Sequence, residues 1–267
     1  MVDMHKEELK INGYSHIGEI LTPEEVSWFY NHLISEKKRE IDDFGVDYLK
    51  KNYSLEVLQD LSRFGKKYHE IILNKKINSI VDSALNNKAV IHSYNSVILD
   101  NKEKSDVQGY KFHRDMPWFP DCRTSIIIMI PLVDFNLENG STQLVPGTHL
   151  FKNMPSEEYL EKHVISVQGR AGEAYVVDAT LWHRSGKNNS ELPRPMIVLR
   201  YSLAPFKQQI DYCLSNTNLE HAHPLVKQRL GWDVRVPNNY LDCGDWNQST
   251  RKFKSGQYDM TNTYLYE

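Results

Sequence analysis

Cysteine is scarce in this sequence, with only Cys122, Cys213 and Cys243 among 267 residues. An odd number of widely spaced cysteines provides neither a disulfide framework nor the C-x-x-C pairs of a structural zinc site. Residues 1–10 are polar, whereas a secretory signal peptide needs an apolar core. We therefore expect a protein of the reducing cytoplasm.

Long apolar runs and an excess of charge of one sign are also missing. The longest apolar run, 126–133, is interrupted by Pro131 and is far shorter than the ~20 residues of a membrane-spanning helix. The formal charge is −3, from 32 basic and 35 acidic residues, which gives no electrostatic reason to expect a nucleic acid or an anionic membrane as partner. We expect a small-molecule substrate, no nucleic-acid or membrane partner, and a monomer or homodimer.

No linker rich in Pro, Gly or Ser divides the chain, so residues 1–267 are expected to form one domain. Within the first part of the chain, Thr22 and Glu25 have the spacing of a capping box, which marks the start of a helix. Two further stretches have helical periodicity, 54–72 and 74–86. Because each helix has one apolar stripe, we expect residues 1–87 to form a helical buttress against a sheet.

From residue 88 the periodicity becomes that of β-strands. The segments concerned are short, rich in Val, Ile and Tyr, and separated by turn residues: 88–99, 109–113, 125–133, 141–145, 163–168, 173–178, 180–185 and 195–203. Many short strands with frequent turns are typical of a sandwich or barrel and not of βαβ units. We predict a mainly β core over 88–205 and a C-terminal extension over 206–267 with one helix near 224–230.

One His-x-Asp pair stands at the end of a predicted strand. His113 and Asp115 are two residues apart, so in a strand they point to the same face. His183 follows 70 residues later in another predicted strand. Two histidines and one carboxylate on one face of a metal are the facial triad of iron(II) oxygenases, which leaves positions free for a chelating cosubstrate and for O2.

The segment after His183 adds a candidate site for a carboxylate. Ser185 lies two residues further, hence on the same face as His183, and residues 186–189 read as a turn before Arg194. If 183–185 and 194–202 form a hairpin, Arg194 lies across from the metal strand and binds the far carboxylate of 2-oxoglutarate through its guanidinium. Arg200 is the alternative, but it lies about 20 Å further along the strand, so both cannot bind one small cosubstrate.

With these residues in its motifs, the sequence resembles the phytanoyl-CoA dioxygenase family of 2-oxoglutarate oxygenases. The matching segments cover nearly the whole chain: FHRD (112–115), ENGSTQLVPGTHL (138–150), GEAYVVDATLWHRSGKN (172–188), PRPMIVLRYS (193–202), GYSHIGEILTPEE (13–25) and QRLGWDVRVP (228–237). The spacing of 11 residues from His183 to Arg194 fits the cosubstrate arginine of that family, and Ser185 matches its serine beside the distal histidine.

The resemblance implies a double-stranded β-helix of jelly-roll or cupin-like type, with N-terminal helices packed on one sheet. It implies an Fe(II)- and 2-oxoglutarate-dependent dioxygenase in which His113, Asp115 and His183 bind the metal. Such an enzyme uses O2, releases succinate and CO2, and most commonly hydroxylates its substrate; epoxidation, desaturation or cyclisation would use the same residues. The expected substrate is a small metabolite or natural-product intermediate, and the sequence contains no signature of coenzyme A binding.

Several other residues have a role to test. Asn95 and Tyr110 are candidates for contact with the cosubstrate, and Trp118 and Phe119, which follow the triad carboxylate, either line the substrate pocket or only pack. Asp178 could orient a metal-binding histidine.

The polar segment 102–108, together with Trp118, Phe119 and part of 206–267, is expected to form a lid. The alternative function is a cupin-like isomerase or binding module that holds a metal without 2-oxoglutarate turnover.

Overall fold

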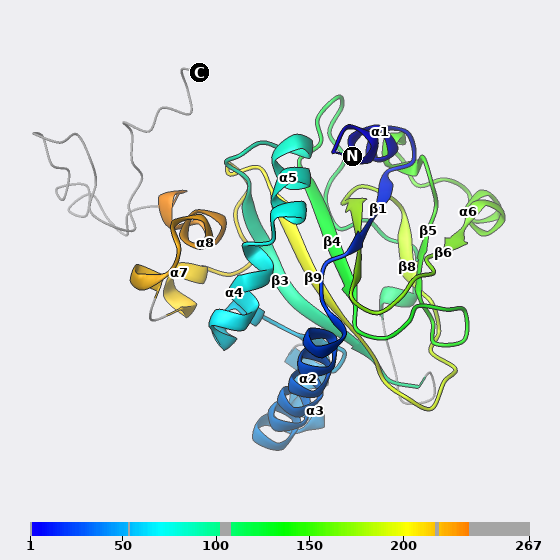
Figure 1. Ribbon diagram of the computed structural model, residues 1–267. Coiled ribbons are helices and arrows are strands. Elements are labelled where there is room, and N and C mark those ends of the chain that lie inside the picture. Colours follow the sequence, from blue (N-terminus) through cyan, green and yellow to red (C-terminus); the bar gives the residue numbers. More distant parts are fainter. Residues whose placement is uncertain (1, 53, 102–107, 217–218, 235–267) are drawn as a thin grey trace, which may run out of the picture.

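Within residues 2–52, 54–101, 108–216 and 219–234, which the computed structural model describes, the strands form two antiparallel sheets (Figure 1). The larger sheet has six strands in the order β1 (Tyr14–Glu19), β7 (Glu173–Asp178), β4 (Ser125–Pro131), β9 (Arg194–Ser202), β3 (Val90–Leu99) and β2 (Val57–Leu58). The smaller sheet has three strands in the order β6 (Ile165–Ser166), β5 (Thr142–Leu144) and β8 (His183–Ser185).

The larger sheet is covered on both faces, and its central strands show this in their residue types. Ile126, Ile128 and Ile130 of β4 pack into the core shared with the helices. Ile127 and Met129 of the same strand pack into a second core with residues of the smaller sheet. Because side chains alternate between the faces of a strand, a continuous apolar run is what a sheet buried on both sides requires.

Eight α-helices lie in the described part of the chain: α1 (Val2–Ile11), α2 (Pro23–Phe44), α3 (Val46–Asn52), α4 (Lys66–Ile72), α5 (Lys75–Ala84), α6 (Glu157–His163), α7 (Tyr212–Ser215) and α8 (Pro224–Arg229). Short 3-10 helices are η1 (Leu61–Phe64), η2 (Gln108–Tyr110), η3 (Thr148–Leu150), η4 (Leu219–His221) and η5 (Trp232–Val234). The helices contain more residues than the strands, so the predicted mainly β composition holds only for the core.

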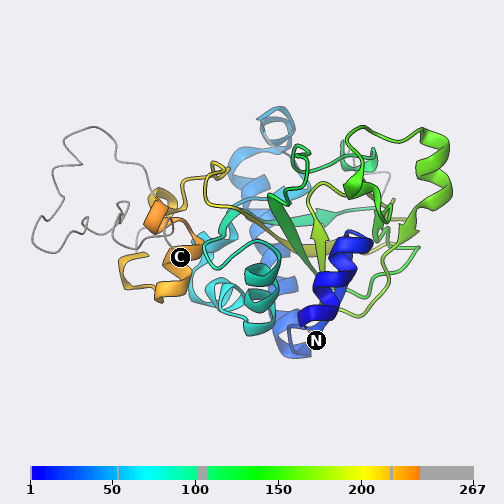
Figure 2. The same ribbon diagram turned by 90° about the horizontal axis from the view of Figure 1, so that it is seen from above.

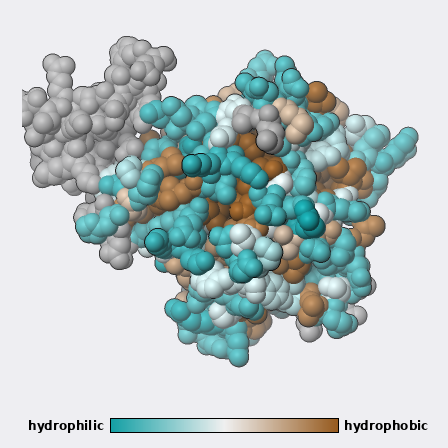
Figure 3. Space-filling model, in the orientation of Figure 1, coloured by the Kyte–Doolittle hydropathy of each residue, from teal (hydrophilic) through white to brown (hydrophobic). Residues whose placement is uncertain are grey.

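The predicted packing of N-terminal helices on one sheet is confirmed. Phe29 and Leu33 of α2, with residues of α4 and α5, share a core with the outer face of the larger sheet, and Figures 1 and 2 show α4 and α5 across that face. The capping box of α2 is also present, since Thr22 and Glu25 bond each other's backbone N–H. On the same side, hydrophilic side chains cover most of the surface (Figure 3).

Two local predictions are wrong. Residues 54–72 do not form one helix, because Asp60 and Gly65 take positive φ values (53° and 83°) that interrupt it, leaving β2, η1 and α4. The segment 109–113 is not a strand but contains η2 and an isolated bridge at His113. In the helix α1, Nδ1 of the buried His5 lies 2.8 Å from the Ser15 hydroxyl oxygen.

The predicted hairpin of 183–185 with 194–202 is also wrong, because β8 pairs with β5 in the smaller sheet whereas β9 pairs with β3 and β4 in the larger one. The expected lid falls mostly on residues 102–107 and 235–267, which lie outside the described residues. In the described part of the chain, no helix is both long and apolar enough to cross a bilayer.

The predicted helix near 224–230 is confirmed as α8, and Arg229 at its end ties it to the rest of the chain. This side chain is 1% exposed. It donates to the Asn78 amide oxygen at 3.1 Å and to the Ala89 carbonyl at 2.9 Å, and it forms an ion pair with Asp82. The guanidinium therefore joins α8 to α5 and to the residue before β3.

We expect Arg229→Met to destabilise the protein, because three acceptors lose a charged donor and two of them are buried. Hydrogen bonds to charged groups contribute about 1.5–3 kcal/mol, so the melting temperature should fall by roughly 4–8 °C. Thermal unfolding by circular dichroism measures this. Lys227→Ala on the same helix removes a side chain whose ammonium lies 4.8 Å from the Trp232 ring and should cost no more than about 1 kcal/mol. Equal melting temperatures for both variants would contradict this role of Arg229.

Candidate active site

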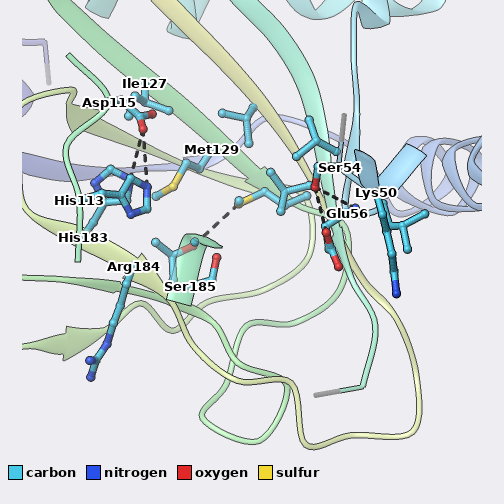
Figure 4. Close-up of a pocket in the computed structure, with 17 residues that line it drawn as sticks. Lys50, Ser54, Glu56, His113, Asp115, Ile127, Met129, His183, Arg184 and Ser185 are labelled. Carbon is cyan, nitrogen blue, oxygen red and sulfur yellow. Dashed lines mark hydrogen bonds and ion pairs between the residues drawn. The ribbon is translucent and has the colours of Figure 1, made fainter. Parts of the chain in front are cut away.

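The side chains of His113, Asp115 and His183 converge on one point, as the sequence analysis expected. One ligand atom from each lies within 4.8 Å of the others, which makes the three a group able to hold a metal ion. Oδ1 of Asp115 is 3.7 Å from Nε2 of His113 and 3.8 Å from Nε2 of His183. Figure 4 shows both contacts meeting at one oxygen of Asp115.

A backbone bridge brings the two histidines together. The His113 N–H donates to the His183 carbonyl at 2.9 Å, and the His183 N–H donates to the His113 carbonyl at 3.1 Å. Residues paired in this way carry neighbouring side chains, and the two imidazole centroids are 4.3 Å apart. Asp115 is held next to them because its N–H donates to the Ala179 carbonyl at 3.0 Å.

The backbone also fixes the tautomer of both histidines. Nδ1 of His113 lies 2.8 Å from the Lys111 carbonyl, and Nδ1 of His183 lies 2.8 Å from the Leu181 carbonyl. A carbonyl only accepts, so Nδ1 carries the hydrogen and Nε2 keeps a lone pair directed at Asp115. Burial lowers the pKa of His183, against an opposing effect of Asp115, which favours the neutral form that binds metals.

Asp178 does not orient a histidine, contrary to the suggestion from the sequence. It accepts from the Arg123 guanidinium at 2.7 Å and from the Thr180 hydroxyl at 2.7 Å. The backbone carbonyls of Lys111 and Leu181 orient the two histidines instead.

A cavity of about 640 Å³ opens in front of the three residues. Ile127, Met129, Met196 and Val198 of the larger sheet line one side, and β5 and β8 contribute Thr142, Arg184 and Ser185. Across from the histidines, Lys50, Ser54 and Glu56 form the far wall (Figure 4). A volume of this size suits a small organic molecule. The sequence analysis missed Thr142, Met129 and Met196; the alternation along 125–131 and 194–202 contains the signal for the two methionines but none for Thr142.

Arg194 is fully buried, yet its guanidinium has no hydrogen-bond partner in the part of the chain that the structure describes. Its exposed fraction is 0%, and none of its three guanidinium nitrogens has an acceptor among the described residues. Burial lowers its pKa to about 10, which leaves it charged at neutral pH, and Tyr110 acts in the opposite direction. The guanidinium carbon lies 4.9 Å from the Phe135 ring centroid. A buried cation without a counter-ion is costly and indicates an anionic ligand.

Tyr110 and Ser185, two further candidates for contact with the cosubstrate, line one cavity. Both border a polar cavity of about 380 Å³, Ser185 also lines the main cavity, and the buried Tyr110 hydroxyl has no hydrogen-bond partner among the described residues. The turn after Ser185 packs tightly: a Cβ on Gly140 (φ 69°) would lie 2.5 Å from the Gly186 carbonyl oxygen. Only glycine fits at position 140, and its lack of a side chain lets the segments ENGST (138–142) and SGKN (185–188) approach each other closely.

Asn95 lies away from Arg194. On β3 it pairs with Val198, four residues from the strand end that pairs with Arg194. Its amide oxygen accepts from the Asp60 N–H at 3.2 Å, and it lines a third, polar cleft of about 460 Å³ that borders Asp115. Of the three candidates, Tyr110 acts on the charge of Arg194, Ser185 lines cavities with Tyr110 and with the histidines, and Asn95 lies away from Arg194.

Arg200, the alternative anchor for the cosubstrate, instead contacts Asp115. Its Nη1 donates to the Asp115 carbonyl at 3.0 Å.

Trp118 and Phe119 line none of the three cavities, and the Phe119 ring lies 5.7 Å from that of Phe206.

Several solved structures resemble this fold. EvdMO1 superposes with a TM-score of 0.61 at 19% identity, over 75% of this chain and 49% of that one. The non-heme alpha ketoglutarate dependent epimerase SnoN from nogalamycin biosynthesis superposes with a TM-score of 0.59 at 20% identity, over 76% of this chain and 83% of its own. At these identities the likeness concerns the fold.

Relatives in sequence extend over the whole chain. The uncharacterized protein Rv1501 of Mycobacterium tuberculosis (strain ATCC 25618 / H37Rv) is 29% identical over 262 residues, which are 96% of either chain. The dioxygenase cdmA of Talaromyces verruculosus is 24% identical over 248 residues, which are 85% of this chain and 81% of that one. Residues 9–196, well over half of the chain, match the phytanoyl-CoA dioxygenase (PhyH) family. The chain therefore belongs to the phytanoyl-CoA dioxygenase (PhyH) family.

Proposed function

We propose that this protein is an Fe(II)- and 2-oxoglutarate-dependent dioxygenase that hydroxylates a small organic molecule. The observation that carries the proposal is the convergence of His113, Asp115 and His183 on one point, in a structure that also holds the partnerless Arg194. Membership of a dioxygenase family supports it. The related fold of SnoN, whose structure in complex with Fe3+, alpha ketoglutarate and nogalamycin RO is known, also supports it.

The donor set fits iron. Two imidazole Nε2 atoms and one carboxylate oxygen form a mixed nitrogen and oxygen site, which suits iron(II) and leaves positions for further ligands. Both imidazoles already have the tautomer needed, because Lys111 and Leu181 hold their Nδ1–H groups. The protein therefore contributes a site whose ligands need little rearrangement when the metal binds.

The environment of Arg194 fits one carboxylate of 2-oxoglutarate. A guanidinium offers two parallel N–H donors to a carboxylate, and this one has no competing acceptor among the described residues. The Tyr110 hydroxyl, also without a partner, and the Ser185 hydroxyl are the further donors that we assign to the cosubstrate. Asn95, in the cleft beside Asp115, is placed better for the substrate.

Bound iron(II) supplies the activation of O2, coupled to the conversion of 2-oxoglutarate to succinate and CO2. The chain's own residues orient the reactants and exclude water. Ile127, Met129, Met196 and Val198 give the cavity an apolar side that strengthens the electrostatic contacts within it. The polar cleft next to Asp115, with Gln59, Asn95 and Gln209 in its lining, supplies hydrogen-bonding groups for the substrate.

A cupin-like isomerase or binding module remains the alternative function. Such a protein needs a metal site but has no need of a buried cation without a counter-ion, so Arg194 favours the oxygenase. For the fold we propose that the two sheets form the double-stranded β-helix of this enzyme class, within one domain over 1–267.

We expect His183→Ala to weaken iron(II) binding by more than about 100-fold, because the loss of a group that merely orients a ligand already costs about 10–100-fold. Anaerobic calorimetric titration measures it. His163→Ala, which changes an exposed histidine of α6, is the matched control and should bind iron as the wild type does. Unchanged affinity in His183→Ala would refute the metal site.

We expect Arg194→Met to weaken 2-oxoglutarate binding to the metal-loaded protein. Losing one partner of a buried charge pair costs about 2–5 kcal/mol, which corresponds to a rise in Kd of roughly 30-fold to several thousand-fold. Since no described residue accepts a hydrogen bond from the Arg194 guanidinium, the same change should leave the melting temperature unchanged or raise it. Titration of the Mn(II) form and thermal unfolding test both points. Wild-type affinity for 2-oxoglutarate would exclude Arg194 as the carboxylate partner.

A further inference from the structure

We propose that Arg200 is a positioning residue of the metal centre, which holds Asp115 so that a single carboxylate oxygen faces the metal. The inference rests on the proposed metal site and goes beyond it, because it assigns a role to the second arginine of β9. The sequence analysis treated this residue only as an alternative anchor for the cosubstrate. Its contacts in the structure are of a different kind.

The position of Arg200 follows from the alternation along β9. Arg194, Met196, Val198 and Arg200 occupy every second position, and Met196 and Val198 line the cavity in front of the histidines. Arg194 pairs with Leu99 and Arg200 with Ser93 on β3, so six residues separate the two guanidinium groups along the strand. At ~3.3 Å per residue this is about 20 Å, which sets the two cations at opposite ends of one row.

Arg200 reaches Asp115 twice. Nη1 donates to the Asp115 backbone carbonyl at 3.0 Å and lies 3.6 Å from Oδ2 of the same residue. The other carboxylate oxygen, Oδ1, lies 3.7 and 3.8 Å from the two histidine Nε2 atoms. One oxygen thus faces the metal-binding imidazoles and the other faces a fixed cation.

This support matters because Asp115 does not belong to a strand. Its main chain is anchored by the N–H groups of Asp115 and Met116, which both donate to the Ala179 carbonyl at 3.0 and 3.1 Å. The carboxylate torsion is intrinsically soft, so the two oxygens would exchange freely without a partner. Arg200 is the one arginine or lysine that ion-pairs with Asp115 among the described residues, and it restrains both the main chain and the carboxylate.

The neighbours of Arg200 show which group its charge acts on. His92 is the extra residue where the pairing of β3 with β9 shifts register, and it lies near both Arg200 and Asp115. Among the described residues, the carboxylate that ion-pairs with Arg200 is that of Asp115, at 3.6 Å. The positive charge of Arg200 therefore acts on Asp115.

The consequence concerns the number of free positions at the metal. A carboxylate that uses one oxygen occupies one position, whereas a chelating carboxylate occupies two. Two histidines and one carboxylate oxygen leave room for a chelating cosubstrate and O2. By holding Oδ2 away from the histidines, Arg200 preserves that room.

The test uses Co(II), which binds in place of iron without reacting with O2 in the same way, and whose visible absorption reports the coordination number. The full chain with Arg200→Met should bind Co(II) between about tenfold and about 100-fold more weakly than the wild type, the range known for residues that orient metal ligands. Its cobalt absorption should differ in intensity. Arg39→Met, the same change at an exposed arginine of α2 outside the site, should leave Co(II) affinity and the metal-only spectrum unchanged.

Arg200→Lys preserves the charge and the apolar stem but not the forked donors, and it serves as the second variant if Arg200→Met fails to fold. It should bind Co(II) with intermediate affinity. Wild-type Co(II) affinity and spectrum in either folded variant would overturn the inference. His183→Ala separates the two proposals. If His183→Ala and the Arg200 variants all bind Co(II) normally, the metal site itself is refuted. If His183→Ala loses Co(II) and the Arg200 variants bind it normally, only the role of Arg200 is refuted.

Discussion

The arrangement of the site depends on the backbone bridge between His113 and His183. These residues are far apart in the sequence, and two hydrogen bonds of 2.9 and 3.1 Å join an otherwise irregular segment to the end of the smaller sheet. The bridge sets the imidazoles next to each other, and carbonyls two residues before each histidine fix their tautomers. Asp115 reaches the same point through its own bond to Ala179 and its contacts with Arg200.

The larger sheet supplies the second requirement, a rigid inner face. Its outer face packs against the helices, whose apolar side chains fill the core there. Its inner face is free to carry function along β9, where two arginines flank two apolar residues. One guanidinium is paired with Asp115, and the other has no acceptor among the described residues. Identical side chains on one strand thus differ in role because their neighbours differ.

Much of the site could be predicted from the sequence, because metal-binding residues obey short-range rules. The His-x-Asp spacing put His113 and Asp115 on one side, and they do lie together, although the segment is not the strand we assumed. The hairpin was wrong for a physical reason: a turn signal after Ser185 shows where the chain bends, not which sheet the next strand joins. The contact of Arg200 with Asp115 crosses 85 residues, so no local pattern reveals it.

The buried charge of Arg194 links stability to function. A guanidinium without a counter-ion destabilises the folded protein, since burial removes its water and nothing replaces it. The pKa of about 10 shows that even so the group stays charged at neutral pH. A carboxylate entering this site would therefore meet donors that are already desolvated and oriented, and part of the cost of binding is met during folding. In the proposed function, the desolvated Arg194 guanidinium would therefore contribute to the affinity for the anion.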